Sequence, residues 1–212
     1  MTDPNQDPIS DDLLRRASQL SSATLHEAAG RRGALPAVLR PLALSMHMAG
    51  RAFPVRCPTG DNLWIHHALV AAEEGDVLVI DAGPGGAAFG YWGEVMANAA
   101  IARGLAGIVI TGGVRDSLRL VELGLPTFSA SVTIAGTGKD KTGDGSITDP
   151  VRIGEIIVRR GDLILGDADG VVALSPDASR EAIPLSEARD AAEVSIIERI
   201  RAGATTLDVY TL

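Results

Sequence analysis

The chain contains very little cysteine, few aromatic residues and no excess of positive charge. Its single cysteine, Cys57, excludes an intrachain disulfide and a cysteine-based zinc site. No run of eighteen apolar residues occurs, and the N-terminus MTDPNQDPISDD has neither the basic nor the apolar region of a secretion signal. The net charge of −8 argues against a surface that binds a phosphate backbone. We therefore expect a cytoplasmic protein that binds neither nucleic acid nor a membrane.

The pattern of the chain predicts one α/β domain. Apolar residues make up 46% of the 212 residues, enough for a sizeable core, although aromatic residues supply only 3%. The polar, proline-containing residues 1–11 predict a flexible N-terminal arm, and residues 12–212 a single domain. Strand-like and helix-like segments alternate through the middle, and Gly-Asp turns join two or three antiparallel strands within 156–174. This order predicts a mixed sheet layered with helices, the last helix running from about 175 to 203.

Two fully apolar runs, 77–81 and 106–111, predict buried strands, with helices at 94–104 and from Asp116 or Ser117 to Leu123. The first run ends in VLVIDAGPGG, which superficially matches the glycine loop of a methyltransferase or a dinucleotide-binding turn. Such a loop needs a helix that starts at its last glycine and an acidic residue after the next strand. Neither is present, so a plain turn is the favoured interpretation.

Glu94, Arg115 and Asp116 lie at two neighbouring strand ends, with twenty residues between Glu94 and Arg115. Strand ends are where α/β sheets bind ligands. A carboxylate can hold a divalent metal, and an arginine beside it can bind a substrate carboxylate. The free amides at the start of the helix at 94 could receive an anion. Structural roles are also open: Glu94 as a first-turn acid favoured by the helix dipole, and Asp116 as a helix N-cap.

At these residues the sequence resembles the RraA-like family. The motif is Gly93-Glu94, the twenty-residue gap and Arg115-Asp116. The resemblance covers roughly residues 12–208 and implies a layered α/β/β/α sandwich with a mixed sheet. Members are also labelled dimethylmenaquinone methyltransferase or regulator of ribonuclease E activity A. Further matching segments are Gly50-Arg51-Ala52, Asp61-Asn62-Leu63, Gly75-Asp76-Val77-Leu78-Val79, Gly112-Gly113-Val114, Gly161-Asp162-Leu163 and Asp167-Ala168-Asp169-Gly170-Val171-Val172.

The resemblance implies a lyase, a class II pyruvate aldolase acting on 4-hydroxy-4-methyl-2-oxoglutarate or 4-carboxy-4-hydroxy-2-oxoadipate. Oxaloacetate decarboxylase activity is implied as well. By position, Asp116 would bind Mg²⁺ or Mn²⁺, and Glu94 would hold waters around that ion. Arg115 would bind the 2-keto and carboxylate oxygens of the substrate, beside Gly93 and the amides of Val95 and Met96. The expected catalytic residues are therefore Arg115, Glu94 and, from a neighbouring subunit, Glu193.

The resemblance also implies a homotrimer or a hexamer with active sites at subunit interfaces. By spacing, Glu193 would match a glutamate that family members contribute from a neighbouring subunit, although a solvent-facing helix acid is equally consistent with the pattern. Many members carry an acid three residues after the motif aspartate, where this chain has Arg119. That positive charge would compete with a metal or recruit a second substrate carboxylate.

Several alternatives remain open at this point. The family also contains inhibitors of ribonuclease E, so a non-catalytic protein-binding regulator is the second functional hypothesis. His66 and His67 are interpreted as structural, because adjacent helix positions point about 100° apart and cannot act as one pair. Tyr91 and Trp92 could wall a pocket or pack at a subunit contact. The loops 83–92 and 135–149 are expected to set substrate selectivity.

Overall fold

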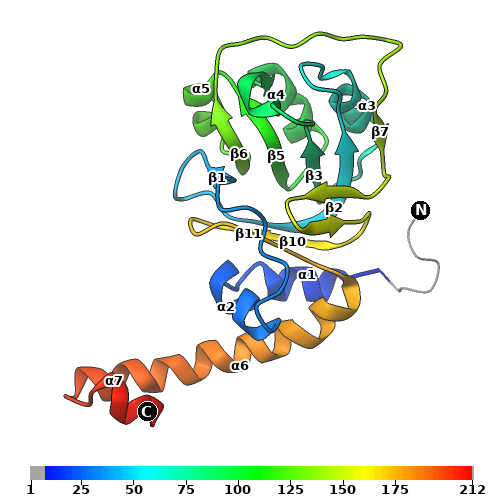
Figure 1. Cartoon of the computed structure of the whole chain (residues 1–212). Helices are drawn as coiled ribbons and strands as arrows, with labels where there is room; N and C mark the ends of the chain where they lie inside the picture. Colours follow the sequence, from blue (N-terminus) through cyan, green and yellow to red (C-terminus); the bar gives the residue numbers. More distant parts are fainter. Residues whose placement is uncertain (1–7, 212) are drawn as a thin grey trace.

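The computed structural model describes residues 8–211, so most of the arm expected at 1–11 lies outside the described residues. At the centre of the described part lies a nine-stranded mixed sheet (Figure 1). The strands of this sheet are β1 (Arg40–Pro41), β2 (Met48–Arg56), β3 (Asp76–Asp81), β4 (Gly90–Trp92), β5 (Gly107–Val114), β6 (Thr127–Val132), β7 (Ser146–Ile147), β10 (Leu163–Gly166) and β11 (Val171–Leu174). They follow the order β1-β6-β5-β3-β2-β10-β11, with β4 beside β5 and β7 beside β2.

Helices cover both sides of this sheet. They are α1 (Asp11–Ala17), α2 (Ser22–Ala28), α3 (Leu63–Ala71), the short 3₁₀ helix η1 (Gly86–Ala88), α4 (Glu94–Ala102), α5 (Ser117–Leu123), α6 (Pro176–Arg201) and α7 (Thr206–Tyr210). Among the described residues, no helix is both long and apolar enough to cross a membrane.

The strands β2, β3, β5 and β6 are parallel neighbours, and α3, α4 and α5 connect them. These three helices lie together on one side of the sheet (Figure 1). The interior strands are apolar on both faces, as strands covered on both sides must be, and Val77, Leu78, Val79 and Ile80 have no exposed surface. The parallel strands therefore bring their carboxyl ends, and the loops that follow them, to one edge of the molecule.

The strands β10 and β11 continue the sheet in antiparallel pairing beyond β2, with Leu163 opposite Arg51. They form the lower β layer in Figure 1, and α1, α2 and α6 pack beneath them. A second core fills the space between the two β layers and includes the separate hairpin of β8 (Val151–Ile153) and β9 (Ile156–Val158). The order of layers is helix, sheet, sheet, helix, so the predicted α/β/β/α sandwich with a mixed sheet is confirmed.

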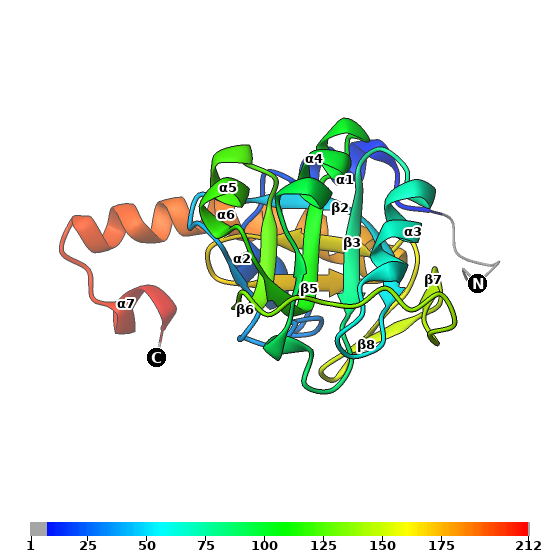
Figure 2. The same cartoon turned by 90° about the horizontal axis from the view of Figure 1, so that it is seen from above.

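The last long helix leaves the body of the molecule. Ser175 caps α6 by accepting a hydrogen bond from the Ala178 amide, and Pro176 occupies the first turn. The buried residues of α6 end at Ser186, and the rest of the helix projects away from the sheet with α7 at its end (Figures 1 and 2).

Local signals located most elements, but three details differ from the sequence prediction. The sequence after Asp61-Asn62 predicts a helix up to the stop glycine Gly75, but α3 ends at Ala71, because Ala72 is extended and the Glu73 amide donates to Asp76. The strand β9 pairs with β8 rather than with β10. The three-residue strand β4, which precedes α4, was not expected, and it places the start of α4 beside the end of β5.

Candidate active site

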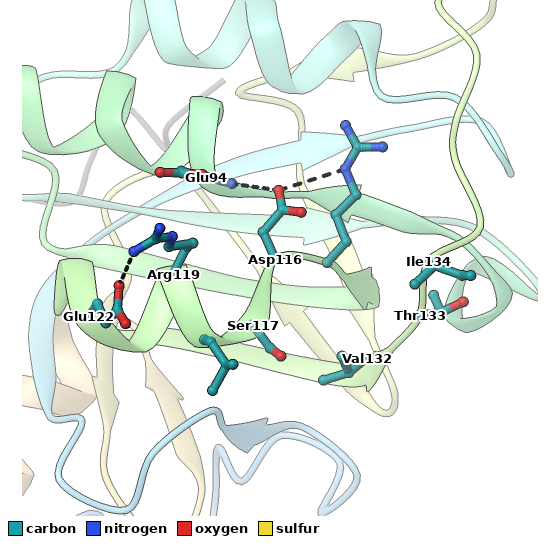
Figure 3. A pocket seen from close by; sticks show the side chains of 10 residues that line it. Glu94, Asp116, Ser117, Arg119, Glu122, Val132, Thr133 and Ile134 are labelled. Atoms are coloured by element: carbon teal, nitrogen blue, oxygen red, sulfur yellow. Dashed lines mark hydrogen bonds and ion pairs between the residues drawn. The ribbon is translucent and has the colours of Figure 1, made fainter.

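The carboxyl end of β5 and the amino end of α4 meet in one place. The Arg115 amide donates to the Trp92 carbonyl over 2.8 Å, which joins the end of β5 to β4. Just beyond this contact, the Glu94 amide donates to Asp116 Oδ2 over 3.0 Å. The spacing in the sequence therefore corresponds to real proximity, and Glu94, Arg115 and Asp116 line one hollow. Glu94 and Asp116 are labelled in Figure 3.

Asp116 has a backbone conformation that an L-residue rarely adopts. It occupies the N-cap position of α5 with φ 57° and ψ 34°, and its side chain makes no capping hydrogen bond to α5. A left-handed residue other than glycine costs about 1–2 kcal/mol. The structural role expected of an N-cap aspartate is thus absent, and the carboxylate turns toward α4. Strain of this kind at a cleft is a reason to look for function.

Gly93 makes this arrangement possible. A Cβ added at Gly93 would lie 2.5 Å from Asp116 Oδ2 and 3.2 Å from Arg115 Cγ. No side chain fits at that distance, so only glycine allows the carboxylate of Asp116 to lie against the start of α4. The Arg115 Nε atom is 3.9 Å from the same carboxylate oxygen, and both side chains are about half exposed.

Two hollows adjoin this pair, and both are lined by Arg115 and Asp116. The larger one has a volume of about 710 Å³ and is shown in Figure 3. Its other lining residues are Glu94, Ser117, Leu118, Arg119, Glu122, Val132, Thr133 and Ile134. The smaller one has a volume of about 290 Å³, and its other lining residues are Asn62, His66, Tyr91, Gly93, Val95, Met96 and Lys139.

The smaller hollow contains buried polar atoms without a partner. Asn62 is only 6% exposed; its side-chain nitrogen donates to the Tyr91 carbonyl over 2.9 Å, but its Oδ1 has no hydrogen-bond partner among the described residues. The Nε2 atom of His66 is also buried without a partner in this part of the chain. Burial, and then the positive charges of Lys139 and His67, lower the pKa of His66, which favours the neutral imidazole. Buried polar atoms of this kind need a ligand or water.

Three residues of the smaller hollow escaped the sequence interpretation. Asn62 was noted only within a segment that matches the family, His66 was interpreted as structural, and Lys139 was not singled out. A signal for Lys139 was present, because Lys139 and Lys141 are the only lysines of the chain and lie in one loop. The surroundings of His67 do fit a structural residue, since its ring packs against Trp64 with centroids 5.3 Å apart.

The remaining candidates lie in different surroundings. Tyr91 is buried and lines the smaller hollow, and its hydroxyl donates to the Ala82 carbonyl over 3.0 Å. Trp92 is fully buried in the core under α3 and α4, so the alternative of a subunit contact is wrong for this residue. Arg119 lines the larger hollow and donates to Glu122 over 2.6 Å. Glu193 pairs with Arg189 on α6, which packs on the opposite side of the sheet (Figure 1).

The donor set at the junction of the hollows fits a hard divalent cation. Asp116 Oδ1 and the carboxylate of Glu94 have no hydrogen-bond partner within residues 8–211, and both residues line the larger hollow. Within that range no group of three or more His, Cys, Asp or Glu residues could hold a metal. An ion bound by one or two carboxylates keeps most of its waters, as Mg²⁺ commonly does, whereas Zn²⁺ takes three or four protein ligands.

The start of α4 offers two further donors. The amides of Val95 and Met96 lie in the first turn, where the helix supplies no acceptor, and no other acceptor is found for them in the described part of the chain. Both residues line the smaller hollow together with Arg115 and Lys139. This hollow therefore gathers two cationic side chains and free amides, which suits a small carboxylate.

Comparison with known proteins gives a family for this arrangement. A family model described as RraA-like, Aldolase/RraA, matches residues 9–173. A protein of Halalkalibacterium halodurans, provisionally named 4-hydroxy-4-methyl-2-oxoglutarate aldolase, is 38% identical over 140 residues. These residues are 66% of this chain and 65% of the relative, so the match spans just under two thirds of the relative's length.

Solved structures match over more of the chain. An uncharacterised protein from Pseudomonas syringae pv. tomato DC3000 has a TM-score of 0.85 at 25% identity, covering 100% of this chain and 99% of that chain. The Streptomyces coelicolor protein RraAS2, described as an unusual member of the RNase ES inhibitor RraA family, has a TM-score of 0.74 at 28% identity. That match covers 91% of this chain and 99% of the other.

Proposed function

The chain belongs to the RraA-like family, and we propose that it is a divalent-metal-dependent lyase of the pyruvate aldolase type. It would cleave a 4-hydroxy-2-oxo diacid to pyruvate and a second 2-keto acid, and would also decarboxylate oxaloacetate. The observation that carries the proposal is the left-handed Asp116, whose carboxylate leaves its own helix and faces a hollow shared with Arg115 and Glu94. A residue held in this conformation for stability alone would be expected to cap α5.

The 2-keto acid end of the substrate fits the smaller hollow. Arg115 can donate two parallel hydrogen bonds to a carboxylate or to adjacent keto and carboxylate oxygens. The free amides of Val95 and Met96 lie in the same hollow, where the start of α4 favours negative charge. Lys139 adds a second cationic side chain, and Asn62 and His66, each with one buried unpartnered atom, also line this hollow.

Cleavage of 4-hydroxy-4-methyl-2-oxoglutarate breaks the bond between C3 and C4. The electron pair of that bond moves to C3 and gives the enolate of pyruvate, the C4 hydroxyl loses its proton, and C4 becomes the keto carbon of a second pyruvate. A proton then returns to C3. A Mg²⁺ or Mn²⁺ ion bound at Asp116 would supply positive charge for the enolate oxygen. The guanidinium of Arg115 adds to that stabilisation, and a single such donor is commonly worth about 3 kcal/mol.

Glu94 is placed to handle the proton. Glu94 lines the larger hollow together with Asp116, and its amide is held by Asp116 Oδ2. A water oriented by this carboxylate can take the proton of the C4 hydroxyl and return one to C3. Glu94 would then act through a water molecule. This is consistent with its position, because Glu94 lines the larger hollow but not the smaller one.

A second copy of the chain is part of the proposal. Glu193 lies on α6, across the sheet from Asp116, so it can contribute only to the site of a neighbouring subunit (Figure 1). The projecting end of α6 and α7 exposes apolar side chains that a homotrimer or a hexamer would cover. These side chains are Val194, Ile197, Ile200, Leu207 and Tyr210. The rim of the site is also apolar and exposed, at Val95, Leu118, Val132 and Ile134.

The test is pyruvate release from 4-hydroxy-4-methyl-2-oxoglutarate and from oxaloacetate, with Mg²⁺ and then with EDTA. Asp116→Asn keeps the size of the side chain and an oxygen that can accept from the Glu94 amide, so it removes mainly the charge. We expect metal-dependent turnover in the unaltered protein and a loss of at least a hundredfold in the variant. Turnover that persists in Asp116→Asn would refute the assigned site.

A non-catalytic protein-binding regulator of the ribonuclease E inhibitor type is the second candidate. The similarity to RraAS2 favours it, because that protein is described as an unusual member of the RNase ES inhibitor RraA protein family. A regulator has no need of a strained aspartate or of unpartnered polar atoms in a hollow. Well-folded protein without turnover on any 4-hydroxy-2-oxo acid, but with inhibition of ribonuclease E, would favour the regulator.

A further inference from the structure

The segment 135–145 forms a strap that runs from β6 toward β7 above α4 and α3 (Figure 1). It has no regular secondary structure, and four of its eleven residues are glycines, so its backbone has many accessible conformations. It also carries both lysines of the chain. Lys139 lines the smaller hollow, and within residues 8–211 its ammonium has no hydrogen bond or ion pair. Because no side-chain interaction among the described residues holds the Lys139 ammonium in place, its position depends on the backbone of the strap.

The backbone on both sides of Lys139 is fixed to residues 60–62. The Gly138 amide donates to the Gly60 carbonyl over 2.7 Å, and the Asn62 amide donates to the Gly138 carbonyl over 3.2 Å. On the other side of Lys139, the Asp140 amide donates to Asp61 Oδ2. These contacts include a parallel β-bridge between Asp61 and Gly138.

Asp61 joins the strap to the site. Asp61 is only 7% exposed, and its second carboxylate oxygen, Oδ1, accepts from the Leu63 amide over 2.8 Å at the start of α3. One buried carboxylate therefore holds the start of α3, which carries Asn62 and His66, and the strap residue that follows Lys139. A charged acceptor with two amide donors makes stronger hydrogen bonds than a neutral one.

We infer that Asp61 is a positioning residue that holds the Lys139 ammonium over the smaller hollow as a second cation for the carboxylate of a 2-keto acid. The inference rests on the proposed function. Its physical basis is preorganisation: a lysine on a free glycine-rich loop loses conformational freedom when it binds an anion, whereas a lysine on a fixed backbone loses less. Asp61 does not touch the substrate in this scheme and acts only through Lys139.

The strap has a second attachment that serves as a matched control. Arg56 pairs with Asp144 over 3.1 Å near the β7 end of the strap, at a surface where Asp144 is 92% exposed. The residues 141–143 separate this contact from the Asp61 contact. Asp144→Asn removes a strap contact of similar chemical type without affecting the backbone next to Lys139.

The experiment measures the dissociation constant of pyruvate in the presence of Mg²⁺ by calorimetry, and the exchange of the pyruvate methyl protons with D₂O. The variants are Asp61→Asn, Lys139→Met, the double variant and Asp144→Asn. In Asp61→Asn an NH₂ group replaces one carboxylate oxygen, so the side chain can no longer accept from both the Leu63 and the Asp140 amides. If this variant does not fold, Asp140→Pro replaces it, because proline lacks the donated N–H and leaves Asp61 intact.

We expect Asp61→Asn and Lys139→Met each to raise the dissociation constant about tenfold, as loss of one charged hydrogen bond does. The double variant should be no weaker than Lys139→Met, and Asp144→Asn should stay within about twofold of the unaltered protein. Hydrogen exchange of residues 138–140 should be faster in Asp61→Asn.

Two results would overturn the inference alone. The first is an unchanged dissociation constant of pyruvate in Asp61→Asn. The second is a further tenfold loss of pyruvate affinity when Asp61→Asn is added to Lys139→Met, because Asp61 would then act independently of Lys139 and be merely structural. Absence of pyruvate binding and of methyl exchange in the unaltered protein would instead overturn the proposed function and the inference together. Pyruvate binding and methyl exchange in the unaltered protein thus test the proposed function separately from the role of Asp61.

Discussion

Gly93→Ala adds a single methyl group at the contact between α4 and the strained aspartate. The new Cβ would lie 2.5 Å from Asp116 Oδ2, whereas carbon and oxygen atoms rest at about 3.5 Å. The carboxylate must therefore retreat by about 1 Å. It would then lose its 3.0 Å hydrogen bond from the Glu94 amide, which fixes its direction. The second contact, 3.2 Å to Arg115 Cγ, displaces the arginine in the same sense.

The expected effect on activity is large compared with the effect on stability. A displacement of about 1 Å in a catalytic group can cost about a hundredfold in rate. Overpacking costs about 1–3 kcal/mol of folding free energy, and less where exposed side chains can move away. The Gly93 backbone is extended, with φ −157°, a conformation that alanine also adopts. A folded protein with a disabled site is therefore the expected outcome.

The assay combines Mn²⁺ titration, pyruvate release from 4-hydroxy-4-methyl-2-oxoglutarate and a thermal melt. Gly136→Ala is the matched control, because its added Cβ would lie 4.0 Å from the Arg115 Nη1 atom, an ordinary contact. We expect kcat/KM to fall about a hundredfold in Gly93→Ala and less than twofold in Gly136→Ala. If Gly93→Ala keeps its Mn²⁺ affinity and kcat/KM within twofold of the unaltered protein, the geometry assigned to Asp116 is not the functional one.

Two further predictions concern charge and pH. Arg119→Gln should tighten Mn²⁺ binding several-fold at low salt, because Arg119 shares the hollow with Glu94 and Asp116 and repels a cation; equal affinities at low and high salt would contradict this. Burial raises the pKa of Asp162 from 3.8 to about 6, so between these values the folded protein holds a proton that the unfolded chain has released. The contribution of Asp162 to folding stability should fall by up to about 3 kcal/mol as the pH rises from 4 to 6. Asp162→Asn, which keeps an acceptor for the Arg159 amide, should flatten that part of the curve of melting temperature against pH, and a curve of unchanged slope would refute the assignment.

The sequence predicted those parts of the fold that depend on local signals. The apolar runs that became β3 and β5 stand between glycine turns, and the ends of α4 and α5 follow their capping residues and glycines. The strand β4 has no such signal. Its three residues follow a glycine-rich loop and become a strand only because β5 lies beside them. The pairing of β9 with β8 is likewise decided by packing in the second core.

The candidate site shows the same division between local and tertiary information. The spacing of Glu94 and Asp116 was visible, since a strand and a helix of known length bring their ends together. The left-handed conformation of Asp116 was not visible, because nothing in Arg115-Asp116-Ser117 favours it over an ordinary helix cap. Lys139 lies 23 residues after Asp116 and reaches the site only through contacts with residues 60–62. Such contacts cannot be read from a glycine-rich loop.

The distribution of charge around the two hollows would orient the proposed 2-keto acid substrate. The smaller hollow gathers Arg115, Lys139 and the free amides of α4, and it has little negative charge apart from Asp116 at its edge. The larger hollow has Glu94, Asp116 and Glu122, against Arg115 and Arg119. A carboxylate is therefore attracted to the smaller hollow, and a cation to the junction at Asp116. Under the proposed function, a 2-keto acid bound in this way would place its C3–C4 bond toward the larger hollow, where about 710 Å³ is available for the departing fragment.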